Sequence, residues 1–195
     1  MKRYLLLLMA AFALAYTACS KESGIDGNTD PEDSTSTPPN TKKDSIVSYS
    51  EVQFALLPGS ETYGRVFSTI KGKVYTDNVP DSIGKYLDLA FINFGSSSMF
   101  FASVNDPSFD LKLPGVTTTL VRNTVPDSIL AVSAFDTLTH AATLNKQTIA
   151  TDDGSFASTD LPVLILFQNG YGKKGVIKVK SMGLETITAD IKVVY

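Results

Sequence analysis

Short apolar runs with the periodicity of β-strands fill the chain from about residue 46 onward. Val52, Phe54 and Leu56 alternate with other residues, which is the period of a half-buried strand. Further runs, separated by Gly, Pro, Asn and Asp, predict strands over 65–70, 73–76, 85–94, 98–104, 116–121, 162–167, 176–181 and 186–194. The pattern therefore predicts an all-β fold, either an antiparallel β-sandwich or a flattened barrel.

Two turn sequences join neighbouring predicted strands. Lys71-Gly72 predicts a two-residue hairpin turn, and the loop 169–173 is rich in residues that tolerate positive φ. The last three predicted strands therefore form a β-meander. In the middle strand of this meander, Ile177 and Val179 alternate with lysines, so we expect these two side chains to face the core.

One short helix is predicted within the β-rich region. Ser133 and Asp136 have the spacing of a capping box, and apolar residues then recur on one face at helical spacing. We therefore expect a helix over about 134–144. His140, the only histidine, lies near the polar side of this helix and is predicted to be exposed to solvent.

The N-terminal segment has the layout of a bacterial export signal that ends at a cysteine. Lys2 and Arg3 precede an apolar run that is too short to span a bilayer, and small residues lead to Cys19, the only cysteine. The sequence from Tyr16 to Cys19 resembles the lipobox of bacterial lipoproteins. That resemblance implies cleavage before Cys19 and its modification by fatty acyl chains such as palmitate, and the alternative is an ordinary cleaved signal peptide.

This layout divides the chain into a signal peptide (1–18), a lipidated and disordered tether (19–45) and a β-sandwich domain (46–195). The tether is polar and rich in Pro and Ser, so it cannot bury enough apolar surface to fold. Ser20-Lys21-Glu22 resembles the signal that sends lipoproteins of Bacteroidota to the outer face of the outer membrane. We therefore expect a lipid anchor in the outer membrane and exposure at the cell surface, with the periplasmic face as the alternative.

Composition and motifs narrow the function further. The formal net charge is −3 and no basic stripe is present, so nucleic acid is not an expected partner. A single histidine and a single cysteine do not support a metal site, and the chain has neither a Gly-x-Ser-x-Gly elbow nor a phosphate-binding loop. We therefore predict a non-enzymatic protein with no catalytic residue and no metal, and no cofactor unless it binds haem.

Asp followed by Ser or Thr and then by an aliphatic residue or Thr recurs along the chain. This pattern resembles the O-glycosylation acceptor motif of exported Bacteroidota proteins. The resemblance implies modification at Ser34, Ser45, Ser82, Ser128 and Thr137. The alternative is turn chemistry, because Asp-Ser forms local side-chain to backbone hydrogen bonds. Two of these motifs lie in an identical repeat, Val79–Ile83 and Val125–Ile129, which is either a duplicated β-unit or a coincidence.

Several segments also follow one another in the order seen in a known family. They are Phe67-Ser68-Thr69, Gly72–Tyr75, Leu87–Phe91, Gly172–Val179 and Asp190–Val193. Their order resembles the Bacteroidota surface lipoproteins that include the HmuY-type haemophores, and the resemblance implies an all-β fold. Haemophores of this type hold haem with two His or Met ligands, and the residues of these types after the predicted cleavage site are His140, Met99 and Met182.

Three functions follow as hypotheses. The first is a surface protein that captures a glycan or another nutrient, beside an outer-membrane transport complex. The second is a haem-binding, haemophore-like protein. The third is a structural or adhesive subunit that joins its neighbours by edge-strand addition. In all three, the membrane is contacted through the lipid anchor.

Overall fold

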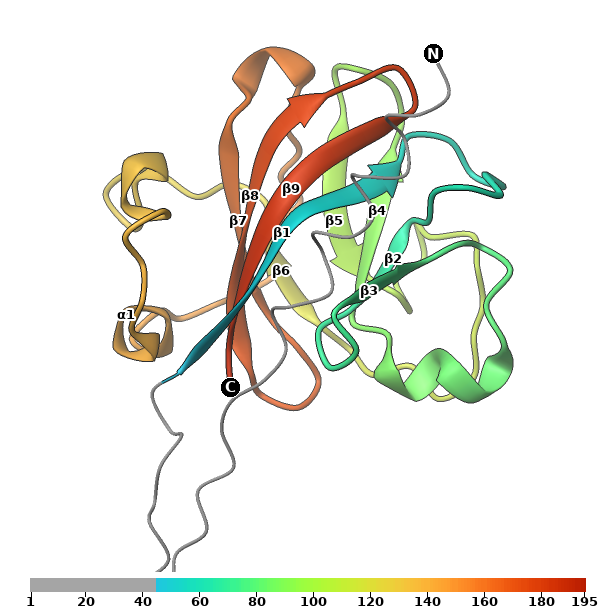
Figure 1. Ribbon diagram of the computed structural model, residues 1–195, viewed down its shortest axis with the longest axis horizontal. Coiled ribbons are helices and arrows are strands. Elements are labelled where there is room, and N and C mark those ends of the chain that lie inside the picture. The colour runs from blue at the N-terminus through green and yellow to red at the C-terminus, as the bar shows by residue number, and fades with distance from the viewer. Residues whose placement is uncertain (1–44) are drawn as a thin grey trace, which may run out of the picture. The chain divides into compact units, whose positions relative to one another are not determined.

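Two antiparallel β-sheets face each other in residues 45–195, the part of the chain that the computed structural model describes (Figure 1). The five-stranded sheet has the spatial order β1 (Ile46–Ala55), β9 (Thr186–Val194), β8 (Lys174–Met182), β7 (Val163–Gln168) and β6 (Leu120–Arg122). The four-stranded sheet has the order β3 (Lys73–Tyr75), β2 (Val66–Ser68), β4 (Leu89–Asn93) and β5 (Met99–Ser103). All strand pairs in both sheets are antiparallel, so the predicted all-β, sandwich-like class is confirmed.

The space between the two sheets holds the main hydrophobic core. Phe54 of β1, Phe91 of β4 and Phe101 of β5 meet there. The ring centroid of Phe101 lies 5.1 Å from that of Phe54 and 5.3 Å from that of Phe91. Ile177 and Val179 are fully buried in the same core, as their alternation with lysines predicts. Burying one large apolar side chain contributes about 1.5–3 kcal/mol, so this core is a major source of stability.

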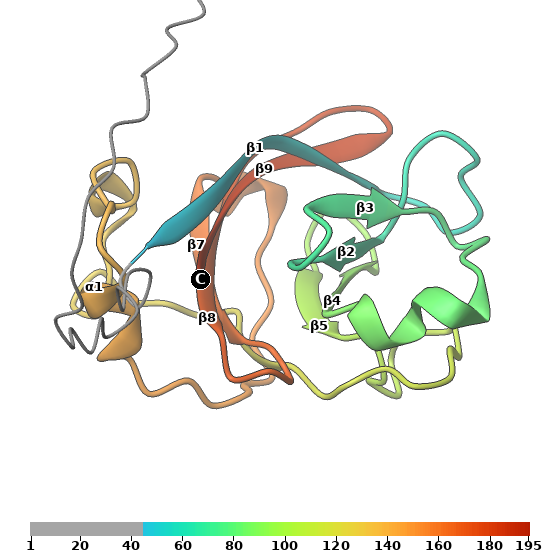
Figure 2. The same ribbon diagram turned by 60° about the horizontal axis from the view of Figure 1, so that its bottom comes forward.

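The outer face of the five-stranded sheet is covered as well. Leu164 and Leu166 of β7 pack under residues 125–149. That segment contains a 3₁₀ helix, η2 (Val132–Ala134), and the one α-helix of the described residues, α1 (Ala141–Asn145). Figure 2 shows this segment on the side of the five-stranded sheet that faces away from the other sheet.

The outer face of the four-stranded sheet packs under a second segment of irregular structure. This cover consists of the 3₁₀ helix η1 (Asp81–Tyr86) and residues 109–116. Residues 89–92 of β4 are consequently buried on both faces. The prediction of a central strand covered on both sides is therefore confirmed for this part of the 85–94 run.

The helix predicted over 134–144 is shorter than expected, because α1 begins only at Ala141. A lysine of the five-stranded sheet gives the physical reason. The Nζ atom of Lys192 donates hydrogen bonds to the carbonyl oxygens of Phe135 at 2.7 Å and Leu138 at 2.9 Å. A continuous α-helix would use these carbonyls for N–H groups four residues later. Here the Phe135 carbonyl instead accepts the Lys192 ammonium and, in a tighter turn, the Leu138 N–H at 3.1 Å.

The capping box predicted from Ser133 and Asp136 is also absent. Nζ of Lys178, an outward-facing residue of β8, donates to the carboxylate oxygens of Asp136 at 2.9 Å and 3.0 Å. The aspartate therefore binds the sheet beneath it instead of capping a helix. The segment follows the surface of the sheet as turns, and only its last part is helical.

The strand predicted over 85–94 begins later than expected. Residues 81–86 form η1, in which Ile83 donates its N–H to the Pro80 carbonyl at 3.0 Å. Gly84 lies so close to the carbonyl oxygen of Pro114 that a Cβ atom would collide with it. The helical turn is therefore packed tightly against its neighbour, and β4 starts only at Leu89.

Two further expectations of local structure are corrected. The strand predicted over 116–121 is reduced to β6, because Thr119 donates its N–H to the Ser103 side-chain oxygen at 2.9 Å instead of to a strand. The hairpin between β2 and β3 is present, but its loop is longer than two residues, because Ser68 pairs with Lys73. Gly72 has a φ of 61° in this loop, which favours glycine.

The predicted meander is confirmed. β7 pairs with β8 and β8 pairs with β9, both antiparallel. In the loop between β7 and β8, the side-chain oxygen of Asn169 accepts the N–H groups of Tyr171 at 3.1 Å and Lys173 at 2.9 Å. Gly172 in the same loop has a φ of 75°, as the composition of this segment predicts.

Candidate functional site

A groove lies along β5, where the edge of the four-stranded sheet approaches β6. It holds about 550 Å³, which is within the usual range for ligand sites. Its walls come from β5, from residues 118–123 and from the loop 151–155. That loop continues into Phe156, which exchanges two backbone hydrogen bonds with Met99 at 3.0 Å and 2.8 Å. The groove is therefore framed by hydrogen-bonded backbone.

Two phenylalanines form an aromatic pair in the groove. Phe94 follows β4, and Phe100 lies on β5 with its side chain on the outer face of the sheet. Their ring centroids are 5.8 Å apart with an interplanar angle of 47°. Phe94 is 67% exposed, which leaves a large apolar ring in contact with water. Because water contact of this kind is unfavourable, the ring is available to a ligand with an apolar face.

Hydroxyl and amide groups line the wall beside this pair. The Ser103 hydroxyl donates to Oδ1 of Asn105 at 2.7 Å and accepts the N–H of Thr119. Thr119 is only 2% exposed, and its own hydroxyl has no hydrogen-bond partner among the described residues. Leaving such a group unpaired costs on the order of 1–3 kcal/mol. The wall of the groove therefore includes one residue, Thr119, whose buried hydroxyl has no partner among the described residues.

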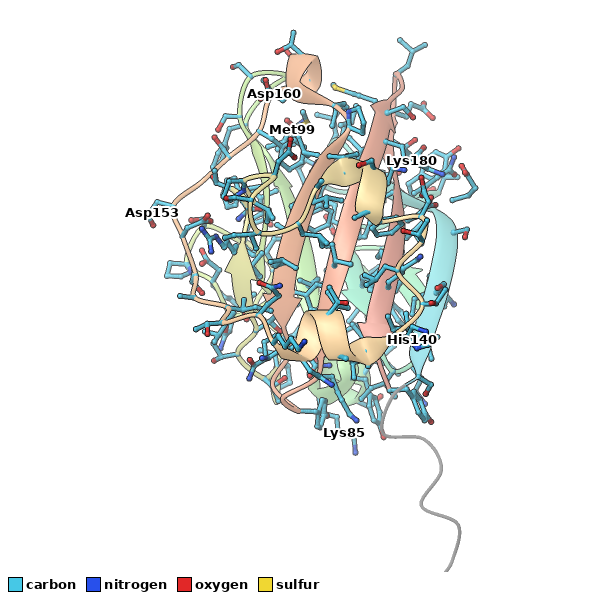
Figure 3. The ribbon with its side chains drawn as sticks, turned by 90° about the vertical axis from the view of Figure 1, so that its left-hand side faces the viewer. Lys85, Met99, His140, Asp153, Asp160 and Lys180 are labelled. Atoms are coloured by element: carbon cyan, nitrogen blue, oxygen red, sulfur yellow. The ribbon has the colours of Figure 1, made fainter. Side chains whose placement is uncertain are left out.

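An aspartate shapes the loop on the other side of the groove. The carboxylate of Asp152 accepts the backbone N–H groups of Asn123 at 2.8 Å, Thr124 at 3.0 Å and Gly154 at 3.3 Å. Both of its oxygens are engaged in this way. The neighbouring Asp153 is exposed and projects from the loop, as Figure 3 shows. Asp152 thus holds the loop in shape, whereas the Asp153 side chain extends into solvent.

The charge of the groove limits the ligands that it fits. Its lining includes the carboxyl groups of Asp106, Asp152 and Asp153, and no Lys, Arg or His is among the described residues that line it. An anionic ligand would find no cation to pair with. A neutral ligand with many hydroxyl groups can donate to carboxylates and amides, and can lay its C–H face on Phe94.

A second polar cluster is buried away from the groove. Asp88 is 0% exposed, and its Oδ2 atom accepts the N–H and the hydroxyl of Thr69, both at 2.7 Å. The Thr69 hydroxyl in turn accepts a hydrogen bond from the side chain of Asn169 at 3.0 Å. Oδ1 of Asp88 has no partner among the described residues, and burial raises the pKa of this carboxyl above its usual value. The cluster ties the β7–β8 loop to the end of β2.

The structure places only some of the predicted modification sites. Cys19 and Ser34 lie outside the described residues. Ser45 is the first described residue and is partly exposed. Ser82, Ser128 and Thr137 are exposed, so all three are accessible on the surface.

The two copies of the repeat adopt the same local structure. Ile83 donates its N–H to the Pro80 carbonyl at 3.0 Å, and Ile129 donates to the Pro126 carbonyl at 2.9 Å. Each isoleucine is partly buried, the first against the outer face of the four-stranded sheet and the second against that of the five-stranded sheet. The repeat therefore forms a turn that begins each of the two covers, rather than a β-unit.

The predicted haem ligands lie in different parts of the fold. His140 is exposed at the N-cap of α1, on the cover of the five-stranded sheet. Met99 is 0% exposed in the core between the sheets, and Met182 is partly buried against that core. Figure 3 shows Met99 and His140 near opposite ends of the fold. The structure therefore does not bring His140 and Met99 together.

Neither the search for metal-binding groups nor the comparison with known proteins assigns a role to the described residues. Within residues 45–195, no group of three or more His, Cys, Asp or Glu side chains is placed to hold a metal ion. The same residues include no helix with the length and apolar character needed to cross a membrane. No family model matches the chain, and no curated protein or solved structure matches it.

Sequence reasoning missed the groove and its aromatic pair. The sequence predicts strands at Phe94 and Phe100 but does not indicate which face of the sheet either side chain occupies. The signal that could have found Phe94 is its position directly before Gly95, which has a φ of 117° at the end of the strand. A glycine after a strand pattern predicts a turn, so the residue before it can lie beyond the sheet.

Proposed function

We propose that this protein is a lipid-anchored surface protein that captures a neutral glycan in the groove beside β5 and does not convert it chemically. The single observation that carries this proposal is the Phe94–Phe100 pair, with its exposed Phe94 ring, beside a polar groove whose described lining contains no cation. Sugars present an apolar C–H face and an edge of hydroxyl groups. The groove offers the matching aromatic surface and the matching acceptors.

The role of Asp152 supports binding without catalysis. A glycosidase needs two carboxyl groups that face each other across the scissile bond, one of them free to give or take a proton. Both oxygens of Asp152 are already held by backbone N–H groups. This carboxylate therefore maintains the shape of the loop and has little freedom to act on a substrate.

The proposed location rests on the N-terminal sequence. Acylated Cys19 would hold the protein at the outer membrane, at the cell surface and beside a transport complex that takes up the captured glycan. The proposed O-glycosylation sites of the described residues are Ser45, which is partly exposed, and the exposed Ser82, Ser128 and Thr137. Mass spectrometry of the protein from membranes is expected to find Cys19 as the acylated N-terminal residue. A Cys19→Ser variant is expected to lose its membrane association, and an unmodified Cys19 in the natural protein would contradict the anchor.

Binding is tested by affinity electrophoresis against soluble starch, β-glucan, xylan and mannan. At least one of these neutral polysaccharides is expected to retard the protein. Phe94→Ala is expected to weaken that interaction roughly tenfold, since it removes the aromatic surface. Leu57→Ala is the matched control, because Leu57 is 71% exposed and lies outside the groove.

Two results would overturn the glycan assignment. One is the absence of retardation by every polysaccharide in the panel. The other is an equal effect of Phe94→Ala and Leu57→Ala, which would show that the groove is not the binding site. A Soret band on titration with haemin that His140→Ala abolishes, combined with no polysaccharide binding, would move the assignment to haem.

A further inference from the structure

Three loops meet at one end of the fold and bring exposed lysines together. Lys71 lies in the turn between β2 and β3, Lys85 lies in η1, and Lys173 lies in the loop between β7 and β8. The hydroxyl of Tyr171 donates to the Lys85 carbonyl at 2.6 Å, which joins the β7–β8 loop to η1. The buried cluster around Asp88 joins the same loop to the end of β2. The three loops therefore form one connected surface.

Two of these lysines share an aromatic ring. The Nζ atoms of Lys71 and Lys85 lie 4.7 Å and 5.0 Å from the ring centroid of Tyr86. Within residues 45–195, neither these lysines nor Lys173 forms an ion pair with an acidic side chain. The nearby carboxylate of η1, Asp81, is exposed and is not paired with them. The ammonium groups are therefore available to an external anion.

Apolar side chains accompany the lysines. Ile70 is 50% exposed and Tyr171 is 48% exposed. Lysines beside exposed aliphatic and tyrosine side chains are typical of protein surfaces that rest at a membrane interface, where the apolar groups enter the headgroup region. The lysine–tyrosine patch is defined as Ile70, Lys71, Lys85, Tyr86, Tyr171 and Lys173.

The patch lies at the end of the domain where the chain enters β1. Ser45 accepts the N–H of Tyr195 at 2.9 Å, and the start of β1, η1 and the β7–β8 loop all lie toward this end in Figure 1. Figure 3 shows Lys85 at this end, and Asp160 of the 3₁₀ helix η3 (Ser158–Asp160) and Lys180 at the opposite end. The start of β1 and the patch therefore lie toward the same end of the domain, with Ile46 under the cover of the five-stranded sheet and η1 on the outer face of the four-stranded sheet.

We propose that the lysine–tyrosine patch docks on anionic lipid headgroups of the membrane that carries the anchor. This inference rests on the lipid anchor of the proposed function. The net charge of the chain is −3, so attraction to a negative surface depends on the local excess of lysines in the patch. Such attraction acts within about a Debye length of the surface, and a domain that the proposed anchor holds at the membrane can bring the patch within that range.

The arrangement favours a lipid surface over a single phosphate ion. The three lysines come from separate loops, and all three side chains are exposed. A site for one phosphate would instead need donors that converge in a recess. Lysines and apolar groups spread across one end of a domain match a layer of headgroups, in which many phosphates lie beside apolar chains.

The test uses residues 19–195 with Cys19→Ser, so that no attached lipid contributes to binding. Co-sedimentation is measured with vesicles of phosphatidylcholine alone and of phosphatidylcholine mixed with phosphatidylglycerol. We expect binding to the mixed vesicles only, and we expect added salt to weaken it. Each lysine contributes about a fivefold change in partitioning, so Lys71→Gln, Lys85→Gln and Lys173→Gln together are expected to reduce binding roughly a hundredfold.

The control combines Lys112→Gln, Arg122→Gln and Lys180→Gln, which changes the net charge equally outside the patch. Three outcomes would overturn the proposal. They are an equal loss of vesicle binding in the two triple variants, equal binding to neutral and mixed vesicles, and no binding to either kind of vesicle. Competition by inorganic phosphate at constant ionic strength would also overturn it, in favour of a single-phosphate site. Polysaccharide retardation is measured on the same variants. Its absence tests the proposed function separately, because the patch lies outside the groove.

Discussion

The side chain of Asn123 completes the backbone hydrogen bonds of Phe101 across the edge of the two sheets. Its Oδ1 atom accepts the Phe101 N–H at 2.8 Å, and its Nδ2 atom donates to the Phe101 carbonyl at 2.9 Å. Asn123 is 6% exposed and follows β6 directly. One amide side chain thus joins the edge of the five-stranded sheet to β5, in the wall of the groove.

Replacing this amide is expected to affect both stability and binding. Asn123→Ala leaves a buried N–H and a buried carbonyl without partners, which is expected to cost about 2–3 kcal/mol of the free energy of unfolding. Urea unfolding measures the loss. Asn145→Ala, at an exposed position of α1, is the control and is expected to change stability by less than about 0.5 kcal/mol. Polysaccharide affinity should fall with Asn123→Ala only, and equal stability of the two variants would contradict this account.

The unpaired hydroxyl of Thr119 allows stability and binding to be separated. Thr119→Val keeps the shape of the side chain and removes a buried polar group without a partner. The free energy of unfolding is therefore expected to stay the same or to rise by about 1 kcal/mol. Because this oxygen is buried from solvent, a ligand in the groove does not reach it, and polysaccharide affinity is expected to change by less than about twofold.

Thermal unfolding and affinity electrophoresis on the same samples test this prediction. Thr148→Val, at an exposed position outside the groove, serves as the control and should change neither quantity appreciably. Clear destabilisation by Thr119→Val would mean that its hydroxyl has a partner in solution, such as an ordered water, and the prediction would fail.

The sequence predicts best those elements that local periodicity determines. β9 has the predicted bounds of 186–194, because its apolar and polar residues alternate along the whole strand. The helix before residue 141 was predicted wrongly because Lys178 and Lys192, distant in sequence, bind Asp136 and the carbonyl of Phe135. No local propensity reveals such contacts.

The groove could not be predicted for a related reason. Its aromatic pair comes from the end of β4 and from β5, two strands that follow each other in the sequence. Its polar wall comes from residues 118–123 and 151–155, which lie farther along the chain. These two segments meet through contacts between residues distant in sequence, such as the Asp152 N–H that donates to the Val121 carbonyl at 3.2 Å. Strand periodicity shows which residues of a strand face the same side. It does not show which strand lies at the edge of a sheet, because that depends on pairing between strands distant in sequence.

The buried carboxyl of Asp88 predicts a specific dependence of stability on pH. Burial raises its pKa in the folded protein, so between the ordinary carboxyl pKa of about 4 and the raised value the folded state binds more protons than the unfolded state. Stability from this group is therefore present at low pH and is lost as the pH rises through the folded-state pKa. Asp88→Asn cannot ionise and should not show this loss.

The measurement is the free energy of unfolding against pH for the natural protein and for Asp88→Asn. The free energy of unfolding of the variant is expected to gain on that of the natural protein as the pH rises through the raised pKa of Asp88. Asp127→Asn, at an exposed site, is the control and should give a curve parallel to that of the natural protein. A gap that is constant with pH for Asp88→Asn would show that the pKa is not raised by burial.

Gly175 of β8 marks a position where the core leaves no room for a side chain. A Cβ atom there would collide with the ring of Phe167 and would lie 2.8 Å from the carbonyl oxygen of Lys192. Gly175→Ala is therefore expected to cost about 1–3 kcal/mol, because a fixed backbone atom and a fully buried ring must both move. Gly183→Ala is the matched control, since its nearest neighbour, the carbonyl oxygen of Thr186, lies 3.5 Å from the added atom.

A second substitution distinguishes the two obstacles at Gly175. If the ring of Phe167 is the main one, Phe167→Leu combined with Gly175→Ala should cost less than the sum of the two single substitutions, by about 1 kcal/mol or more. If the carbonyl of Lys192 is the main one, the two costs should add. Urea unfolding of the four proteins gives the coupling directly. Because the backbone carbonyl is held in the β8–β9 pairing and the ring is held only by side-chain packing, we expect the coupling to be favourable.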